Sequence, residues 1–351
     1  MDSILITGGN GFIGSHVSLS LLKNGYRIII FDSLINSSEM TIDKISEICE
    51  YDNSEISKKI KFVVGDIRDN IALDALFIAE KKNQTPISSV IHLAGLKSIR
   101  ESLSFPIDYW DVNVYGSINL LKTMQKHKCF QIVFSSSASI YGFSDVSLVD
   151  ENSKINPINT YSKTKVAVEN FLNQIYCSAT NRWKIACLRY FNPIGAHSSG
   201  LIGENPKGSP NNIFPLLIRA ALKKDKIFNI FGGDWPTNDG TGIRDYIHVM
   251  DLAEGHLAAM NYLKVNNSQI INFNLGTSKG TSVLELIKTF EKVNKCQIPY
   301  KIINRREGDV SSLIANNKKA LKYLNWRPKR SLEDMCRDGW KWQENNPKGY
   351  N

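Results

Sequence analysis

Tyr161 and Lys165 are the residues whose types and spacing point most directly to chemistry. They stand four positions apart, so a helix places both side chains on one face. An ammonium beside a phenol favours the phenolate, and we therefore expect Lys165 to lower the pKa of Tyr161, so that it can act as a base near neutral pH. Taken alone, the pattern is also common as a surface pair.

A run of serines gives this pair its context. Ser137 closely follows a strand predicted over residues 131–135. The carboxyl ends of parallel strands border the crevice where ligands bind, so we expect the Ser137 hydroxyl to lie there. The three side chains predict proton transfer at a substrate hydroxyl, with Ser137 relaying or sharing the proton. A loop-capping role for this serine is the alternative.

A glycine-rich turn near the N-terminus predicts a second site. Gly8, Gly11 and Gly14 are spaced G-x-x-G-x-x-G between a predicted strand and a predicted helix. Glycine allows a tight turn and a close approach of the backbone to a pyrophosphate, which the helix N-terminus then binds. Asp32 ends the next strand, where a carboxylate accepts hydrogen bonds from a ribose and repels a 2′-phosphate. The pattern predicts a dinucleotide site that prefers NAD to NADP, with an altered, empty pocket as the alternative.

Short β-branched runs alternate with helical patterns through the first half of the chain, as is typical of a parallel sheet covered by helices. Strands are predicted over residues 3–7, 27–31, 61–64, 89–93, 131–135 and 184–189, a helix over 14–24, and a helix with a surface loop over 41–59. After residue 190, Gly, Pro and Asn become frequent, as in ordered loops that carry binding residues. The sequence predicts an α/β fold, with a Rossmann-type doubly wound parallel sheet over 1–190 and a smaller α/β substrate-binding lobe over 191–351. The chain can cross back to the first domain later.

Composition narrows the class of protein. The chain has 351 residues and a formal net charge of +9, which fits either anionic partners or a solvated lysine-rich surface. Its six cysteines include no C-x-x-C pair and its six histidines form no ligand cluster, so we expect no metal site. No nucleic-acid-binding motif, signal peptide or long apolar run is visible. We expect a cytoplasmic protein that binds neither nucleic acid nor membrane.

Beyond these features, the chain resembles the extended short-chain dehydrogenase/reductase family, and within it the UDP-glucose 4-epimerases. The matching stretches, in order, are TGGNGFIGSH, GDIRD, HLAGLKSIRES, FSSSASIYG, YSKTK, LRYFNPIGAH, PNNIFP, DGTGIRDYIHVMDLA and RREGDV. Each is short, but their order and spacing over almost the whole chain make the resemblance specific. It implies NAD as the cofactor, a UDP-sugar as the substrate, and Ser137, Tyr161 and Lys165 as the catalytic residues.

The resemblance also assigns residues to the two ligands. Together with the three glycines, Tyr161 and Lys165, the implied cofactor contacts are Phe12, Ile13, Asp32, Asn36, Asp66, Ile67, Leu93, Ala94, Gly95, Lys97, Asn113 and Phe191. The implied substrate contacts are Lys97, Ser137, Tyr161, Asn192, Asn212, Phe231, Arg244, Arg306, Asp309 and Leu313. Arginine suits a diphosphate because its planar fork binds two phosphate oxygens at once.

The implied reaction is inversion of the C4 hydroxyl of a UDP-hexose through a transient 4-keto sugar. Two alternatives stay open. A sugar-nucleotide 4,6-dehydratase needs an additional acid or base, which that branch of the family carries directly after the catalytic hydroxyl; here those positions are Ala138 and Ser139. A non-catalytic nucleotide-binding regulatory protein is the other, and retention of both Tyr161 and Lys165 argues against it.

One departure from the family pattern concerns substrate size. In the family, the position of Leu313 is a gate beside the 2-substituent of the sugar, where tyrosine restricts the enzyme to glucose and galactose. Leucine is smaller, so we expect UDP-GlcNAc and UDP-GalNAc as substrates alongside UDP-Glc and UDP-Gal, unless another residue closes the pocket. The family also implies a homodimer, formed by the helix that begins near Asn113 and the helix that carries Tyr161.

Overall fold

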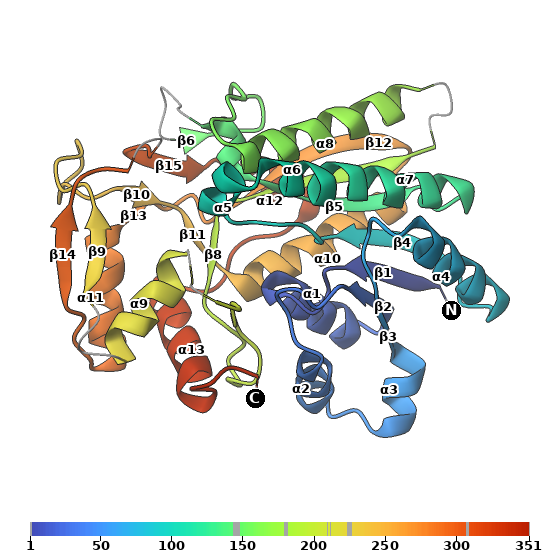
Figure 1. Cartoon of the computed structure of the whole chain (residues 1–351), viewed down its shortest axis with the longest axis horizontal. Helices are drawn as coiled ribbons and strands as arrows, with labels where there is room; N and C mark the ends of the chain where they lie inside the picture. Colours follow the sequence, from blue (N-terminus) through green and yellow to red (C-terminus); the bar gives the residue numbers. More distant parts are fainter. Residues whose placement is uncertain are drawn as a thin grey trace.

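The computed structural model describes residues 2–142, 148–178, 182–208, 210, 212–222, 227–306 and 309–350. Its centre is a seven-stranded sheet in the order β12-β7-β5-β4-β1-β2-β3, in which every neighbouring pair is parallel (Figure 1). The strands are β1 (Ser3–Thr7), β2 (Arg27–Asp32), β3 (Ile60–Val64), β4 (Ile87–His92), β5 (Gln131–Ser137), β7 (Lys184–Tyr190) and β12 (Gln269–Leu275). The predicted Rossmann-type sheet and its six predicted strands are therefore confirmed, with ends shifted by at most two residues.

Successive side chains of each strand enter two different cores, because they point to opposite faces of the sheet. In β1, Ile4 and Ile6 join one core and Leu5 joins the other. The first core contains side chains of α1 (Phe12–Lys23), α2 (Met40–Cys49), α10 (Val249–Val265) and α12 (Lys318–Leu324). The second contains side chains of α4 (Asn70–Lys82), α7 (Gly116–Lys126) and α8 (Thr160–Cys177). The result is a three-layer sandwich whose strands are buried on both faces.

Shorter elements surround these layers. On the sheet side they are α3 (Asn53–Lys59), α5 (Ile99–Ser104), α6 (Pro106–Trp110), the π-helix η1 (Asp111–Tyr115) and the 3₁₀ helix η2 (Ala138–Tyr141). The predicted helix and loop over 41–59 is the pair α2 and α3. Among the described residues, no helix has the length and apolar character needed to cross a membrane.

A smaller lobe lies beside the sheet and has its own core, built from α9 (Ile213–Leu222), α11 (Val283–Asn294) and α13 (Leu332–Asn345) (Figure 1). Its strands are β8 (Asn192–Ile194), β9 (Phe228–Phe231), β10 (Ile243–Arg244), β11 (Tyr246–His248), β13 (Thr281–Ser282), β14 (Tyr300–Ile303) and β15 (Ser312–Ala315). A four-stranded sheet in the order β13-β10-β15-β6 includes β6 (Leu148–Val149) from the earlier part of the chain. Two further sheets pair β11 with β8 and β14 with β9.

The chain does cross back after residue 190, because β12 is the edge strand of the large sheet and α10 packs beneath it. The boundary at residue 190 therefore separates only the residues expected to bind the cofactor from those expected to bind the substrate. This assignment of binding roles stays a prediction.

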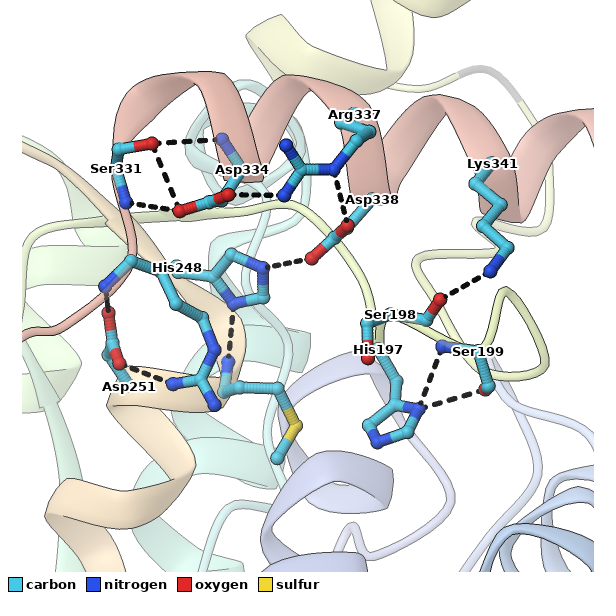
Figure 2. Close-up of polar contacts among 12 residues, drawn as sticks. His197, Ser198, Ser199, His248, Asp251, Ser331, Asp334, Arg337, Asp338 and Lys341 are labelled. Carbon is cyan, nitrogen blue, oxygen red and sulfur yellow. Dashed lines mark hydrogen bonds and ion pairs between the residues drawn. The ribbon is translucent and has the colours of Figure 1, made fainter.

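Helix α13 fastens the smaller lobe to the start of α10 and to a loop that leads out of the sheet (Figure 2). The Nε2 atom of His248 lies 3.3 Å from Oδ2 of Asp338, and both side chains are buried. Lys341 donates a hydrogen bond from Nζ to the carbonyl oxygen of Ser198 at 2.7 Å. These contacts set the position of the loop that continues through residues 199–208.

Candidate active site

Helix α8 presents the predicted catalytic pair to the carboxyl end of β5. The helix starts at a capping box in which Asn159 accepts a hydrogen bond from the Ser162 backbone at 2.9 Å. Lys165 is buried, and its Nζ donates to the carbonyl oxygen of Ser135 at 2.7 Å. The same Nζ lies 5.8 Å from the centroid of the Tyr161 ring.

Ser137 completes the group. Its hydroxyl oxygen accepts a hydrogen bond from the backbone of Ser139 at 3.2 Å, and its side chain also hydrogen-bonds Tyr161. The structure therefore brings the three predicted catalytic residues together, and Ser137 both caps the loop and reaches Tyr161.

The expected electrostatic effect on Tyr161 is wrong in its net direction. Burial raises the pKa of the Tyr161 phenol, and the opposing contribution comes from the hydrogen bond with Ser137. The reason is geometric: the ammonium of Lys165 is directed at the Ser135 carbonyl and not at the phenol oxygen. Burial also lowers the pKa of Lys165 to about 8, while the nearby Glu169 carboxylate raises it.

The glycine turn between β1 and α1 leaves no room for a side chain at Gly8 or Gly14. Gly8 has a φ of +72°, and a Cβ there would lie 2.7 Å from the backbone nitrogen of Ala94. A Cβ on Gly14 would lie 2.1 Å from the carbonyl oxygen of Gly8. The N-cap of α1, Gly11, makes no side-chain cap hydrogen bond, so no side chain competes there for an anion.

The same turn holds an unsatisfied polar group. The buried side-chain amide of Asn10 has no hydrogen-bond partner among the described residues. Buried polar groups are almost always paired, so this unpaired amide is an exception among the described residues. Phe12 and Ile13 follow as the first residues of α1. The close backbone approach at Gly8 and Gly14, together with the N-terminus of α1, fits a bound dinucleotide phosphate.

Asp32 is fixed beside this turn. Its carboxylate accepts hydrogen bonds from the backbone of Asn10 and Leu34, each at 2.9 Å, and from the Ser37 hydroxyl at 2.7 Å. Nearby, the side chain of Asn36 accepts a hydrogen bond from the backbone of Lys207 at 2.8 Å. The loop from the smaller lobe thus reaches the end of the crevice predicted for adenosine.

The loops after β3 and β4 line the same crevice. Asp66 is ion-paired with Arg68 at 2.6 Å, and this contact lowers the pKa of the Asp66 carboxyl. Ile67 is buried in the core. The backbone of Leu93 donates to the carbonyl of Thr7 at 3.0 Å, which holds the β4 loop against the glycine turn.

Asn113 is a support behind this lining. A Cβ on Gly95 would lie 2.9 Å from the Asn113 Oδ1 atom and 3.9 Å from Lys165 Nζ. The buried Asn113 amide binds both backbone groups of Leu96, at 2.8 and 3.0 Å, and donates to the Thr164 hydroxyl at 3.1 Å. It therefore connects the loop after β4 to α8, which carries the predicted catalytic pair.

Glu204 joins two predicted ligand contacts and was not predicted from the sequence. Its Oε1 atom accepts hydrogen bonds from Lys97 Nζ at 2.7 Å and from Asn212 Nδ2 at 2.9 Å. Only 8% of the Glu204 side chain is exposed. The only sequence signal is its place in the Gly-, Pro- and Asn-rich stretch over 200–212, which gives no role to a single carboxylate.

A second cluster gathers cationic and aromatic residues of the smaller lobe. The guanidinium of Arg306 stacks on the Phe231 ring, with 3.7 Å from its carbon to the ring centroid. Arg244 lies 3.6 Å from a carboxylate oxygen of Asp309, whose backbone donates to the carbonyl of Arg306 at 3.2 Å. Two guanidinium groups beside an aromatic face suit a diphosphate attached to a base.

Asp245 anchors this cluster and was also missed. It is fully buried and accepts hydrogen bonds from Thr277, Ser278 and Ala315 at 2.6 to 3.1 Å. Burial raises the pKa of its carboxyl to about 6. Its backbone oxygen accepts a hydrogen bond from Asn192 at 2.9 Å, so it also places that predicted contact.

Phe191 and Leu313 connect the second cluster to the catalytic strand. Phe191 and Ala138 are buried in one small apolar core, and the half-buried Leu313 packs against it. Leu313 is also paired with Arg244 across the β10–β15 register. Among the described residues, no group of three or more His, Cys, Asp or Glu side chains could hold a metal ion.

Comparison with known proteins places this geometry in context. The sequence pattern of the GDP-mannose 4,6 dehydratase family matches residues 5–339. A UDP-glucose 4-epimerase of Bacillus subtilis is 43% identical over 99% of this chain and 98% of its own length. Two solved structures, each aligned over 99% of both chains, are similar in fold. The UDP-glucose 4-epimerase of Stenotrophomonas maltophila, with bound NAD and formylated UDP-arabinopyranose, is 40% identical with a TM-score of 0.92. That of Bifidobacterium longum, in complex with NAD+ and UDP, is 39% identical with a TM-score of 0.90.

Proposed function

Because the chain belongs to the UDP-glucose 4-epimerase family of extended short-chain dehydrogenases/reductases, we propose that it is an NAD-dependent isomerase that inverts C4 of UDP-hexoses. The observation that carries this proposal is the meeting of Ser137, Tyr161 and Lys165 at the end of β5. A dinucleotide cradle built from the Gly8 turn and Asp32 borders the same end of the sheet.

The chain's own residues divide the work between them. Tyr161 takes the proton of the sugar 4-hydroxyl and later gives it back, and the hydrogen bond from Ser137 favours the phenolate form. Lys165 holds the nicotinamide ribose and keeps a positive charge near the phenol. NAD, when held by these residues, would supply the acceptor and then the donor of the hydride at C4 of the sugar.

The smaller lobe binds the UDP part of the substrate. Arg244 and Arg306 clamp the diphosphate, the Phe231 face supports the base, and Asp309 accepts from the uridine ribose. Asn192 and Asn212 contact the nucleotide sugar. A firm grip on the nucleotide lets the sugar turn over within the site while the substrate stays bound.

Replacement of Tyr161 by Phe tests the assignment. The variant should keep NAD and UDP binding and lose nearly all interconversion of UDP-Glc and UDP-Gal, because general-base catalysis contributes roughly 10²–10⁴-fold to such rates. Tyr323→Phe, at an exposed tyrosine of α12, is the matched control and should remain active. Near-normal turnover of Tyr161→Phe would refute the role.

The matched family pattern makes a sugar-nucleotide 4,6-dehydratase the second candidate. Elimination of water needs an acid or base beside the catalytic hydroxyl, whereas Ala138 is buried and Ser139 carries no charge. Analysis of the products from each UDP-sugar, and from a GDP-sugar, separates the two reactions. Accumulation of a 4-keto-6-deoxy sugar would select the dehydratase.

For the sugar itself, we propose that UDP-GlcNAc and UDP-GalNAc are substrates together with UDP-Glc and UDP-Gal. The support is the half-buried Leu313, which packs against the core that contains Phe191 and offers less bulk than a tyrosine. Leu313→Tyr should lose activity on the N-acetylated pair and keep activity on UDP-Glc and UDP-Gal, while Leu313→Met should keep both. Full N-acetyl activity in the tyrosine variant would contradict the gate.

We also propose a homodimer formed by the η1–α7 segment and α8. Apolar side chains are exposed on and just before η1, with exposures of 80% for Ile107, 43% for Trp110 and 49% for Tyr115, as expected of a surface that another protein covers. Trp110→Glu should give a monomer by analytical ultracentrifugation, whereas Ile78→Glu, at an exposed apolar position of α4, should leave the dimer intact. An unchanged sedimentation coefficient in both would contradict this interface.

A reducing, cytoplasmic location is the last part of the proposal. All six cysteines are free thiols, and Cys129, Cys187 and Cys336 are buried, as is usual where glutathione keeps thiols reduced. Activity recovered with the cytosolic fraction of the native cell would agree with this, and recovery with a secreted fraction would not.

A further inference from the structure

A buried ion pair lies beside the catalytic residues. Glu169 is on α8, one turn beyond Lys165, and Arg189 is on β7. Their side chains are 8% and 2% exposed. Arg189 donates from Nε to Oε1 of Glu169 at 3.1 Å and from Nη2 to Oε2 at 2.8 Å, so the pair is bidentate.

The remaining polar atoms of the pair are satisfied. Arg189 Nη1 donates to the Tyr141 hydroxyl and to the carbonyl oxygen of Glu151, each at 3.0 Å. The Ser136 hydroxyl donates to Oε1 of Glu169. The pair therefore joins α8, β5, β7 and η2 at one point, directly behind Ser137.

The contacts between α8 and β5 follow a regular pattern. Tyr161, Lys165 and Glu169 are spaced by four on α8, so they share one helix face. They bind three consecutive residues of β5, namely Ser135 through Lys165, Ser136 through Glu169 and Ser137 through Tyr161. Glu169 therefore takes part in the same contact between α8 and β5 as the two predicted catalytic residues.

Stability alone does not account for the pair. Removing two charges from water costs several kcal/mol per ion, and well-packed apolar residues in place of a buried pair are often neutral or stabilising by about 1–4 kcal/mol. We propose that Glu169, oriented by Arg189, is a positioning residue for the epimerase reaction, which holds the end of β5 against α8 and places a carboxylate one helix turn from Lys165. This rests on the function proposed above.

The surrounding charges leave Glu169 as the carboxylate that acts on Lys165. It is the group that raises the Lys165 pKa against burial, which lowers it to about 8. On β4, His92 interacts with Lys165, but burial lowers the His92 pKa to about 3, so the ring is neutral. On β7, burial raises the pKa of the Tyr190 phenol and of the Cys187 thiol, which keeps both uncharged, whereas the cation of Arg189 partly opposes the effect of Glu169 on Lys165.

Glu169→Gln tests the proposal because glutamine keeps an acceptor for Ser136 and removes the charge. The readout is the pH profile of kcat for interconversion of UDP-Glc and UDP-Gal, with NAD content measured for each protein. A nearby opposite charge moves a pKa by about one unit or more, and the variant lacks the Glu169 charge. The alkaline limb of the variant should therefore shift by about one pH unit to lower pH, with NAD content unchanged. Glu47→Gln, at an exposed surface pair with Lys44, is the control and should keep the wild-type limb.

Glu169→Gln/Arg189→Gln separates positioning from folding, because it leaves no unpaired buried charge. It should regain thermal stability relative to Glu169→Gln, and its limb should lie between those of Glu169→Gln and the wild type, because the opposing cation of Arg189 is removed together with the carboxylate. A double variant with both the stability and the limb of the wild type would overturn the proposal, as would an unshifted limb in both variants. A wild-type protein that interconverts no UDP-hexose would instead overturn the proposed function.

Discussion

Lowering the pH from 7.5 to 5 should destabilise this protein through histidines that the fold keeps neutral. Burial lowers the pKa of His16 and His92 to about 3 and that of His256 to about 4. In the unfolded chain each imidazole takes up a proton near pH 6.5, whereas the folded protein cannot accept it. The stabilisation from these groups is therefore complete above pH 6.5 and falls as the pH drops toward 4.

The magnitude follows from the pKa differences. At pH 5 each of the three histidines costs about 2 kcal/mol of folding free energy, or about 6 kcal/mol together. Asp245 acts in the opposite direction, because its folded pKa of about 6 is raised by burial. Its carboxyl binds a proton more readily in the folded state, which returns about 1.4 kcal/mol at pH 5. The net loss of unfolding free energy between pH 7.5 and 5 should be about 5 kcal/mol.

Urea unfolding at pH 7.5, 6.5, 5.5 and 5.0 measures this loss, and a matched pair of variants assigns it. His256→Gln removes one titrating ring, so about 2 kcal/mol of the pH-dependent loss should disappear. Tyr190→Phe removes only the hydroxyl that hydrogen-bonds that ring, and it should keep the full pH dependence. A wild-type protein that loses less than about 1 kcal/mol, or a His256→Gln variant with the wild-type pH dependence, would refute the reasoning.

Three further predictions concern the ligand sites. Gly14→Ala should abolish copurification of NAD, because its Cβ would lie 2.1 Å from the Gly8 carbonyl oxygen. The absorbance of the acid extract measures the bound NAD. Gly11→Ala is the control and should retain NAD, because its Cβ would lie 3.4 Å from the same oxygen. Asp32→Asn should shift the NAD-to-NADP affinity ratio toward NADP by about tenfold or more in calorimetric titrations, since the carboxylate charge that repels a 2′-phosphate is gone. Arg306→Lys should raise KM for UDP-glucose about tenfold with a smaller change in kcat, because lysine keeps the charge but loses the planar stack on Phe231.

Local sequence patterns predicted the six first strands of the sheet because each is an apolar run of ordinary strand length beside a turn signal. The seventh, β12, was missed because polar residues interrupt it. Asn274 is fully buried there and is paired with the Tyr141 hydroxyl at 2.6 Å and with the Val149 carbonyl at 3.0 Å. A buried asparagine is tolerated only where distant residues satisfy it, and the sequence of the strand alone does not show them.

Some features of the candidate site could likewise be predicted from local sequence patterns, and others could not. Residue type and spacing placed Tyr161 and Lys165 on one helix face, because that depends only on helix geometry. The direction of the Tyr161 pKa shift was wrong, because burial depends on the packing of several elements around the helix. Glu204 and Asp245 were missed for a related reason: each is a carboxylate whose partners come from separate loops.

The distribution of polar groups within the site bears on how one reaction can return a hydride to either face. Side chains at the nucleotide end are held by charge and stacking, as in the Arg306–Phe231 pair and the Arg244–Asp309 contact. Between that end and the end of β5 lie two apolar side chains, the buried Phe191 and the half-buried Leu313, which carry no hydrogen-bonding group. In the proposed reaction the intermediate must present both faces in turn, so strong directional contacts to the ring would favour one face and slow the return to the other. A firmly held nucleotide, combined with apolar side chains beside the sugar, avoids that cost. A proton-transfer group held by α8 and β5 can then serve both orientations of the intermediate.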